Sequence, residues 1–345
     1  MGTGLIGGSI GLALRRRGWH VTGDDHDPAH AARALELGAL DVVGTDDRAE
    51  ITFLATPVQA VVGAALAALE ATSGVVTDVG SVKASILGVV DHPRFVGGHP
   101  MAGSEQDGVD GADPDLFAGA VWVLTPTAAT DDAAYALVRS VVKDLGADVV
   151  ALAPDHHDAL VAVVSHVPHL TAASLMHLAD ERSTEHRALL RLAAGGFRDM
   201  TRIAAGHPGI WPDICAENRD AIVDVLDALV TSLQSVREVV AKDDRAGLLA
   251  VLERARSARA NLPSRVASAG DLCELRVPVP DRAGVLAEVT TLAGTLDVNI
   301  ADLEIAHSSE GDQGVLILLV EAGAAERLRA GLVDLGYRPA VLPLG

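Results

Sequence analysis

Cysteine and aromatic residues are scarce in this sequence. Only two cysteines occur among 345 residues, and aromatic residues make up 3% of the chain. Cys215 and Cys273 stand in unrelated contexts, which argues against a disulfide framework and favours a reducing, cytoplasmic location. The sequence has no apolar run of membrane-spanning length and no secretory signal, so we expect no membrane partner.

Basic residues are few relative to acidic ones. The chain has 27 Lys and Arg against 47 Asp and Glu, a formal net charge of -20. Such a surface repels nucleic-acid phosphates and anionic lipids, so neither is an expected partner. Hydrophobic residues make up 49% of the sequence, which predicts a globular protein, and the length predicts two or three domains.

Short apolar strands alternate with helical stretches over residues 1–154. Buried strands are expected at "ITFLATP", "GVVTDVGS", "RFVGGHPMAG", "AVWVLTPT" and "ADVVALAP". Helical patterns such as "VQAVVGAALAALEA" lie between several of these strands. The alternation predicts an α/β dinucleotide-binding domain of the Rossmann type, built on a parallel sheet.

The pattern changes near residue 155. Residues 155–262 contain long helical segments rich in Ala and Leu, which we interpret as an all-α domain for substrate binding and dimerisation. A linker with Pro, Ser and Gly follows. Residues 271–345 then show the order strand, helix, strand, strand, helix, strand, which predicts a ferredoxin-like βαββαβ domain.

Three glycines at the start, Gly2, Gly4 and Gly7, form the G-x-G-x-x-G pattern of a dinucleotide-binding turn. This turn normally follows a strand and opens a helix, and here the strand is absent because the chain starts at the turn. A helix cap is the alternative role for these glycines. If a central strand were missing, backbone groups of the neighbouring strands would be buried without partners, and each such group costs about 1–3 kcal/mol of stability. We therefore expect a truncated gene model whose true start lies upstream of Met1.

An acidic residue follows the turn at the distance expected for NAD binding. Asp25 ends the next strand, eighteen residues after Gly7. A carboxylate there accepts hydrogen bonds from the ribose hydroxyls of NAD and repels the extra phosphate of NADP. Asp24 and Asp27 are alternatives to Asp25 for this role.

Two polar motifs follow buried strands, "TDVGSVK" and "GGHPMAGSE". Ser81, in the first motif, could bind a substrate hydroxyl at the carboxyl end of its strand or cap the following helix. In the second, Pro100 favours extended backbone at His99. The imidazole of His99 could act as a general base near neutral pH, or belong to a loop with ordinary hydrogen bonds.

Two histidines of the helical region, His166 and His169, are three residues apart and share a helix face. Together with His156 and His157 they could be metal ligands. However, no carboxylate or cysteine has the spacing of a known catalytic metal motif. We therefore predict that His166 and His169 line a pocket and that no metal is bound.

Two arginines, Arg198 and Arg202, lie four residues apart after a glycine turn. An arginine can bind a carboxylate through two parallel hydrogen bonds, which suits an acidic substrate. Surface ion pairs are the alternative interpretation.

Taken in order, several motifs resemble those of the prephenate dehydrogenase family, which includes cyclohexadienyl and arogenate dehydrogenases. The motifs are "GTGLIGGSIGLAL", "ATP", "DVGSVK", "GGHPMAGSE", "LTPT", "VSHVPH" and "GGFRDMTRIA". The resemblance runs from the first residues to about Asn261. The tail, with "VPVPDRAGVLAEVT" and "VNIADLEI", resembles an ACT domain, a small-molecule sensing module.

The resemblance implies NAD-dependent oxidative decarboxylation of prephenate to 4-hydroxyphenylpyruvate in tyrosine biosynthesis. His99 is then the catalytic base and Ser81 its hydrogen-bonding partner, and Trp211 packs against the site. The remaining site residues implied are Arg202, His166, His169 and Ser104 for substrate, and Gly2, Gly4, Leu5, Ile6, Gly7, Asp25, Thr56 and Pro57 for the cofactor.

The resemblance also implies a homodimer, and an amino-acid effector bound at Asp281, Gly284 and Asn299. Three other functions stay open at this point. An arogenate dehydrogenase would give tyrosine directly by the same chemistry. Another two-domain NAD reductase could act on a small hydroxy or imino acid. A catalytically impaired protein could retain only amino-acid sensing by its tail.

Overall fold

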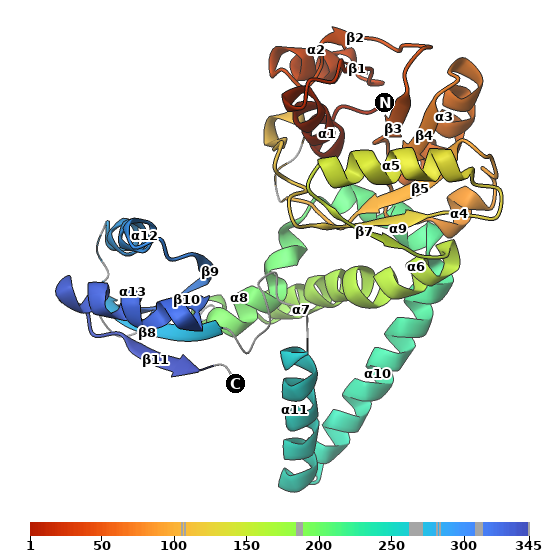
Figure 1. Ribbon diagram of the computed structural model, residues 1–345. Helices are drawn as coiled ribbons and strands as arrows, with labels where there is room; N and C mark the ends of the chain where they lie inside the picture. The colour runs from red at the N-terminus through yellow and green to blue at the C-terminus, as the bar shows by residue number, and fades with distance from the viewer. Residues whose placement is uncertain are drawn as a thin grey trace. The chain divides into compact units, whose positions relative to one another are not determined.

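The computed structural model describes residues 1–104, 106, 108–183, 189–261, 272–280, 282, 284–307 and 313–343 (Figure 1). The chain forms two compact units, Met1–Glu238 and Val239–Gly345.

A five-stranded sheet forms the centre of the first unit. Its strands lie side by side in chain order: β3 (Ile51–Leu54), β4 (Val75–Asp78), β5 (Phe95–Pro100), β6 (Val121–Thr125) and β7 (Asp148–Ala151). The pairs are parallel except for β5 and β6, which are antiparallel. The predicted α/β domain is confirmed, but its sheet is not parallel throughout. A parallel neighbour needs a crossover connection, usually a helix, and in the described residues between β5 and β6 only one short 3-10 turn forms, Val109–Gly111.

Helices cover both faces of this sheet. They are α1 (Leu5–Arg16), α3 (Val58–Ala71), α4 (Ala84–Leu87) and α5 (Asp132–Asp144), whereas α2 (Pro28–Glu36) packs beside β2 (Val42–Val43). Neighbouring residues of β3 pack in different hydrophobic clusters. Phe53 packs in the cluster that contains residues of α1 and α5, whereas Leu54 packs in the cluster that contains residues of α3 and α4. This alternation is the two-residue period of a strand buried on both faces.

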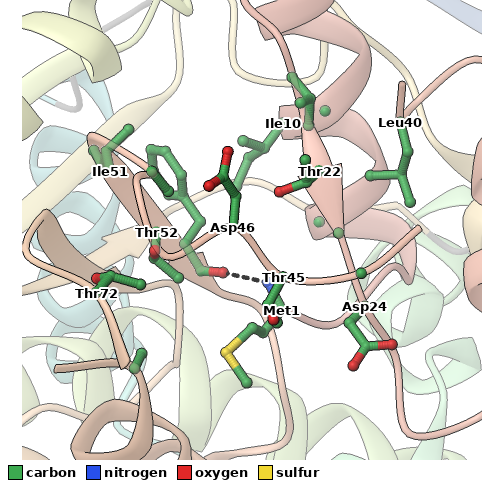
Figure 2. A pocket seen from close by; sticks show the side chains of 18 of the residues that line it. Met1, Ile10, Thr22, Asp24, Leu40, Thr45, Asp46, Ile51, Thr52 and Thr72 are labelled. Atoms are coloured by element: carbon green, nitrogen blue, oxygen red, sulfur yellow. Dashed lines mark hydrogen bonds between the residues drawn. The ribbon is translucent and has the colours of Figure 1, made fainter. Parts of the chain in front are cut away.

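The two-stranded sheet of β1 (Thr22–Gly23) and β2 (Val42–Val43) is separate from the five-stranded sheet. Met1 and Gly2 bridge the two: the Met1 ammonium donates to the Phe53 carbonyl at 2.8 Å, and the Gly2 amide to the Asp24 carbonyl at 2.8 Å. Beside this bridge lies a cavity of about 460 Å³ between β1 and β3 (Figure 2). Ile10, Thr22, Leu40 and Ile51 are among the residues that line it. The strands of this region therefore form two separate sheets with a cavity between them.

Helices follow the sheet, as predicted. The described elements are α6 (Pro154–Val161), a π-helical turn (Ala162–His166), α7 (Val167–Ser183), a 3-10 turn (Leu190–Leu192), α8 (Gly195–Thr201), two further 3-10 turns (Arg202–Ala205 and Pro208–Ile210), α9 (Trp211–Glu217), α10 (Arg219–Ala241) and α11 (Arg245–Ala260).

One of these helices corrects an expectation from the sequence. The continuous helix Pro154–Ser183 is long and apolar enough to cross a membrane, judged by length and composition only. Its polar side chains nevertheless have partners in the protein: the Asp158 carboxylate accepts hydrogen bonds from the amides of Lys83 and Ala84. Such partners are typical of a helix packed in a folded domain, because a lipid-facing carboxylate would be strongly destabilising.

The second unit contains the predicted βαββαβ fold. Its elements are β8 (Leu272–Pro280), α12 (Val285–Thr295), β9 (Ile300–His307), β10 (Gln313–Glu321), α13 (Ala322–Asp334) and β11 (Ala340–Pro343). The strands form an antiparallel, ACT-like sheet in the order β11-β8-β10-β9. Leu275, Val277 and Leu318 from the strands pack with Val289 and Leu328 from the helices.

Arg94 offers a stability test at the start of β5, the strand that carries His99. Its guanidinium donates to the carbonyls of Leu69, Thr72 and Gly74 at 2.6–2.8 Å, and so closes the end of α3. We expect Arg94→Gln to lower the free energy of unfolding by about 2 kcal/mol, since three charged, partly buried hydrogen bonds to carbonyls are lost. Urea unfolding followed by tryptophan fluorescence measures this, because all three tryptophans lie in the first unit. Arg139→Gln, on the exposed side of α5, is the control, and equal losses in both variants would contradict the prediction.

Candidate active site

The glycine turn has the geometry that its sequence predicts. Gly2 has a φ of +85°, and a Cβ there would collide with the Ala55 carbonyl. A Cβ on Gly7 would collide with the Gly2 carbonyl. A Cβ on Gly4 would meet no atom within 4 Å. Gly2 and Gly7 therefore let the turn close on itself, whereas Gly4 leaves open space on its outer side.

The start of α1 fits an anionic ligand. Its N-cap is Gly4, which has no side chain that could accept a capping hydrogen bond from the first helical amides, those of Leu5 and Ile6. A helix N-terminus with such amides attracts phosphate groups. Thr56, which precedes Pro57 and α3, has a buried hydroxyl with no partner among the described residues. Together with the space at Gly4, these features fit the pyrophosphate of a dinucleotide.

Asp25 is tied to the glycine turn itself. Its carboxylate accepts hydrogen bonds from the Thr3 amide at 2.7 Å, the Thr3 hydroxyl at 3.1 Å and the Asp27 amide at 3.1 Å. Burial alone would raise the pKa of Asp25, but these hydrogen bonds bring it below its usual range. Of the two alternatives, Asp27 caps α2 through the Ala29 amide, whereas Asp24 is exposed.

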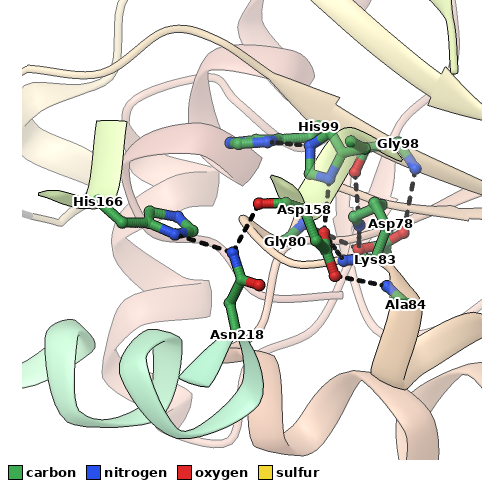
Figure 3. A network of polar contacts seen from close by, with 10 residues as sticks. Asp78, Gly80, Lys83, Ala84, Gly98, His99, Asp158, His166 and Asn218 are labelled. Atoms are coloured by element: carbon green, nitrogen blue, oxygen red, sulfur yellow. Dashed lines mark hydrogen bonds and ion pairs between the residues drawn. The ribbon is translucent and has the colours of Figure 1, made fainter. Parts of the chain in front are cut away.

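A buried ion pair joins the ends of β4 and β5 (Figure 3). Lys83 is fully buried, pairs with Asp78 and donates to the Gly98 carbonyl at 2.8 Å. Asp78 also accepts hydrogen bonds from the amides of Gly80 and Gly98. Burial lowers the pKa of Lys83, and the Asp78 carboxylate opposes that shift. The pair thus anchors the loop of Ser81 against the strand of His99.

Ser81 does not cap α4, contrary to one of its two predicted roles. The helix begins at Ala84, and its first amides are bound by Asp158, which lies 74 residues later in the chain. Lys83 and Ala84 each donate to this carboxylate at 2.8 Å. The sequence reasoning missed this cap because its two parts are far apart in the chain. Ser81 itself is half-buried beside the cap.

His99 lies at the end of β5, in extended backbone as predicted, and is 8% exposed. Burial lowers its pKa well below the usual value, and the charge of the nearby Lys83 ammonium lowers it further. Its Nδ1 lies 2.8 Å from Nε2 of His157. Sequence reasoning considered His157 only as a metal ligand. The adjacent pair His157–Asp158 in "PDHHD" was the available signal for a hydrogen-bonded dyad.

The two histidines predicted to share a helix face, His166 and His169, both contact the Trp211 ring. His169 stacks on the Trp211 ring, with centroids 3.6 Å apart, and His166 meets that ring edge-on. Nδ1 of His166 faces the Asn218 amide nitrogen at 3.2 Å, and its Nε2 is buried with no partner among the described residues. Burial lowers the pKa of His166 to about 4.

Asn218 was not found by sequence reasoning. It also donates to the Asp158 backbone carbonyl at 2.8 Å, and thereby joins α6 to α9 and α10. Within the described residues no group of three His, Cys, Asp or Glu side chains is arranged to hold a metal ion.

The two arginines and Ser104 are exposed. Arg202 opens the short helix that packs on α7, and Gly206 in the same segment lies beside His169. Arg198 donates to the Ala193 carbonyl at 3.2 Å. The Ser104 hydroxyl accepts a hydrogen bond from the Gln106 amide. The segment of Arg202 is therefore close to the histidine pair.

The predicted effector residues belong to the second unit. Gly284 has a φ of +91° and forms the N-cap of α12, with open space around it. Asn299 is exposed just before β9. Asp281 lies outside the described residues. Near this turn Arg282 pairs with Glu288, which also accepts a hydrogen bond from Tyr337.

Comparison with known proteins gives consistent matches. The prephenate dehydrogenase nucleotide-binding domain family matches residues 10–151, and the prephenate dehydrogenase dimerization domain family matches residues 153–254. Prephenate dehydrogenase from Bacillus subtilis (strain 168) is 36% identical over 336 residues, which cover 91% of this chain and 89% of that protein.

Two solved structures are also similar. The crystal structure of Aquifex aeolicus prephenate dehydrogenase in complex with hydroxyphenyl propionate and NAD+ has a TM-score of 0.71 and 32% identity, over 76% of this chain and 96% of that one. The crystal structure of Synechocystis arogenate dehydrogenase has a TM-score of 0.65 and 32% identity, over 75% of this chain and 96% of that one. By its two family domains and its curated relative, the chain belongs to the prephenate dehydrogenase family.

Proposed function

We propose that this protein is an NAD-dependent prephenate dehydrogenase of tyrosine biosynthesis. The reaction converts prephenate and NAD+ to 4-hydroxyphenylpyruvate, carbon dioxide and NADH. The observation that carries the proposal within this family is the buried imidazole of His99 at the end of β5, whose pKa is lowered so that it is neutral and able to accept a proton. NADH formation from prephenate, followed by absorbance, tests it directly.

His99 is the proposed base. NAD+ bound at the glycine turn would accept a hydride from the ring carbon that carries the hydroxyl. As the hydride leaves, His99 takes the hydroxyl proton on Nε2, and Ser81 orients the hydroxyl. Loss of the ring carboxylate as carbon dioxide leaves its electron pair to the aromatic ring, and His99 returns the proton to the ring oxygen, which becomes the phenol hydroxyl of the product. The protein mainly supplies orientation and proton transfer, because aromatisation favours the products.

Arg202, His166, His169 and Ser104 are the proposed substrate-binding residues. The Asn218 amide donates to Nδ1 of His166, so the His166 proton lies on Nε2, the nitrogen that has no partner among the described residues. A buried donor without a partner is costly, and a substrate carboxylate would satisfy it. Arg202 can bind the second carboxylate of prephenate by paired hydrogen bonds.

The cofactor site is proposed at Gly2, Gly4, Leu5, Ile6 and Gly7, with Thr56 and Pro57 beside them. The uncapped amides of α1 and the space at Gly4 support it. Asp25 would bind the ribose, exchanging part of its bonding to Thr3 for the ribose hydroxyls. The corresponding domains are 1–154 for the dinucleotide, 155–262 for substrate and dimerisation, and 271–345 for regulation.

Gly4→Ala tests the cofactor site without disturbing the turn. A methyl group fits into the open space at Gly4 but would stand between the α1 amides and the pyrophosphate. We expect the KM for NAD+ to rise about tenfold, while stability falls by no more than about 1 kcal/mol. The control is Gly63→Ala in α3, where the added methyl also meets nothing within 4 Å. An unchanged KM for NAD+ in Gly4→Ala would exclude the proposed site.

His99→Asn tests the base. The amide keeps a polar group in place but cannot accept the proton at neutral pH, so we expect kcat to fall by about 10²–10⁴-fold. NAD+ affinity, measured by fluorescence titration, should change less than about threefold. Turnover close to that of the unmodified protein would place the base elsewhere.

The pH dependence of kcat/KM gives a second test of His99. The base works in its neutral form, and burial lowers the pKa of His99 well below 6.5. Activity should therefore remain as the pH falls through 6.5 and be lost only at more acidic pH, where the imidazole is protonated. Initial rates of NADH formation from about pH 5 to pH 8 measure this profile. An acidic limb centred at or above pH 6.5 would contradict the structure.

We also propose a homodimer formed by the helical domain. The dimerization-domain match supports it, as do uncovered apolar side chains on α10 and the π-helical turn. Val223, Val230 and Leu233 are 47%, 49% and 56% exposed and follow one side of α10, and Val164 is 66% exposed. Such a stripe is typical of a surface that a second copy covers.

Leu233→Glu should shift the protein toward a monomer, because it places a charge in the proposed interface. The molar mass measured by size-exclusion chromatography with light scattering reports this. Leu66→Glu is the matched control, since Leu66 is 50% exposed on α3 in the nucleotide-binding part. A dimer that persists equally in both variants would rule out this face.

Arogenate is the second candidate substrate, because the arogenate dehydrogenase structure is as similar in sequence as the Aquifex enzyme. Steady-state kinetics with both substrates separates the two activities. For the ACT-like unit we propose an amino-acid effector near Gly284 and Asn299. A cytoplasmic location is proposed because Cys215 and Cys273 are both free thiols.

A further inference from the structure

Three buried side chains form a continuous hydrogen-bonded series that ends at the proposed base. Nδ1 of His99 lies 2.8 Å from Nε2 of His157, and Nδ1 of His157 lies 2.7 Å from Oδ1 of Asp158. His157 is fully buried, and Asp158 is 4% exposed. Figure 3 shows the Asp158 carboxylate facing the loop after β4. The series joins β5 to α6.

The direction of these hydrogen bonds is fixed from the Asp158 end. Oδ1 accepts from the Lys83 amide and Oδ2 from the Ala84 amide, each at 2.8 Å. Backbone amides can only donate, so the carboxylate acts as an acceptor. The ring nitrogen of His157 that faces Oδ1 must then carry a proton. In neutral His157 the single ring proton is therefore on Nδ1, and Nε2 is an acceptor.

The proton position on His99 follows from that on His157. Because Nε2 of neutral His157 has a lone pair, Nδ1 of His99 must donate to it. Neutral His99 has one ring proton, which is therefore on Nδ1. Its Nε2 then has a lone pair. This is the tautomer that a base needs if it is to take a proton from a substrate at Nε2.

We propose that His157, held by Asp158, is a positioning residue that fixes His99 in the Nδ1–H tautomer and presents the Nε2 lone pair to the substrate hydroxyl. This inference rests on the proposed function of His99 as the base. When His99 takes the hydroxyl proton, both of its ring nitrogens carry protons. The new cation keeps its hydrogen bond to His157, and the Asp158 carboxylate stabilises it from the far end of the series.

Two substitutions of His157 test the role in catalysis. His157→Phe fills a similar volume but removes the acceptor for His99. We expect kcat with prephenate to fall about 100-fold, with the KM for prephenate and for NAD+ changed less than about threefold. In His157→Gln the side-chain carbonyl can again accept from His99 and the amide can donate to Asp158. The kcat of this variant should be at least about tenfold higher than that of His157→Phe.

His156→Phe is the matched control, because His156 precedes His157 in the same helix but is exposed. Its kcat should remain within about twofold of the unmodified enzyme. A kcat for His157→Phe within threefold of the unmodified enzyme would overturn the proposal, as would equal losses in the Gln and Phe variants.

A spectroscopic measurement separates this proposal from the proposed function. Nitrogen-15 NMR of the histidine rings, with His99→Asn used to assign the signals, reports which nitrogen of His99 carries the proton. We expect Nδ1–H in the unmodified protein and a shift toward Nε2–H in His157→Phe. Nε2–H in the unmodified protein would overturn the proposal even if no variant folds. Absence of prephenate oxidation together with Nδ1–H would instead overturn the function and leave the tautomer assignment intact.

Discussion

The carboxylate of Asp158 is the interaction on which the site depends. It caps α4 through the amides of Lys83 and Ala84, and it holds His157 through Nδ1. One side chain thereby ties the first helix after the sheet to the loop of Ser81 and, through His157, to the strand of His99. The position of the base is thus determined by contacts between segments that are distant in the chain.

Burial gives this arrangement its chemical character. Lys83 and Asp78 form a fully buried ion pair, and Lys83 donates to the carbonyl of Gly98, the residue before His99. A positive charge so near a buried imidazole disfavours its protonation. The protein therefore keeps the base neutral by the same interactions that join β4 to β5. Buried charged groups of this kind are costly unless fully paired. Here Asp78 also accepts from the amides of Gly80 and Gly98, and Lys83 also donates to the Gly98 carbonyl.

Local patterns in the sequence were sufficient for the elements and for the first turn. Short apolar runs between helical stretches predicted the strands. The spacing of Gly2, Gly4 and Gly7 predicted a turn, and the structure shows close backbone contacts at Gly2 and Gly7. The antiparallel pairing of β5 and β6 was not predictable in this way, because pairing depends on the path of the connection. His157 and Asn218 were missed because their importance arises from partners 58 and 60 residues away.

The π-helical turn Ala162–His166 separates the residues that hold the base from those proposed to hold the substrate. Such a turn contains one residue more than an α-helical turn. The wide turn accommodates this extra residue locally, between α6 and α7. His166 is the last residue of the turn, so the width of the turn determines where this imidazole lies relative to His157 and Asp158 on α6.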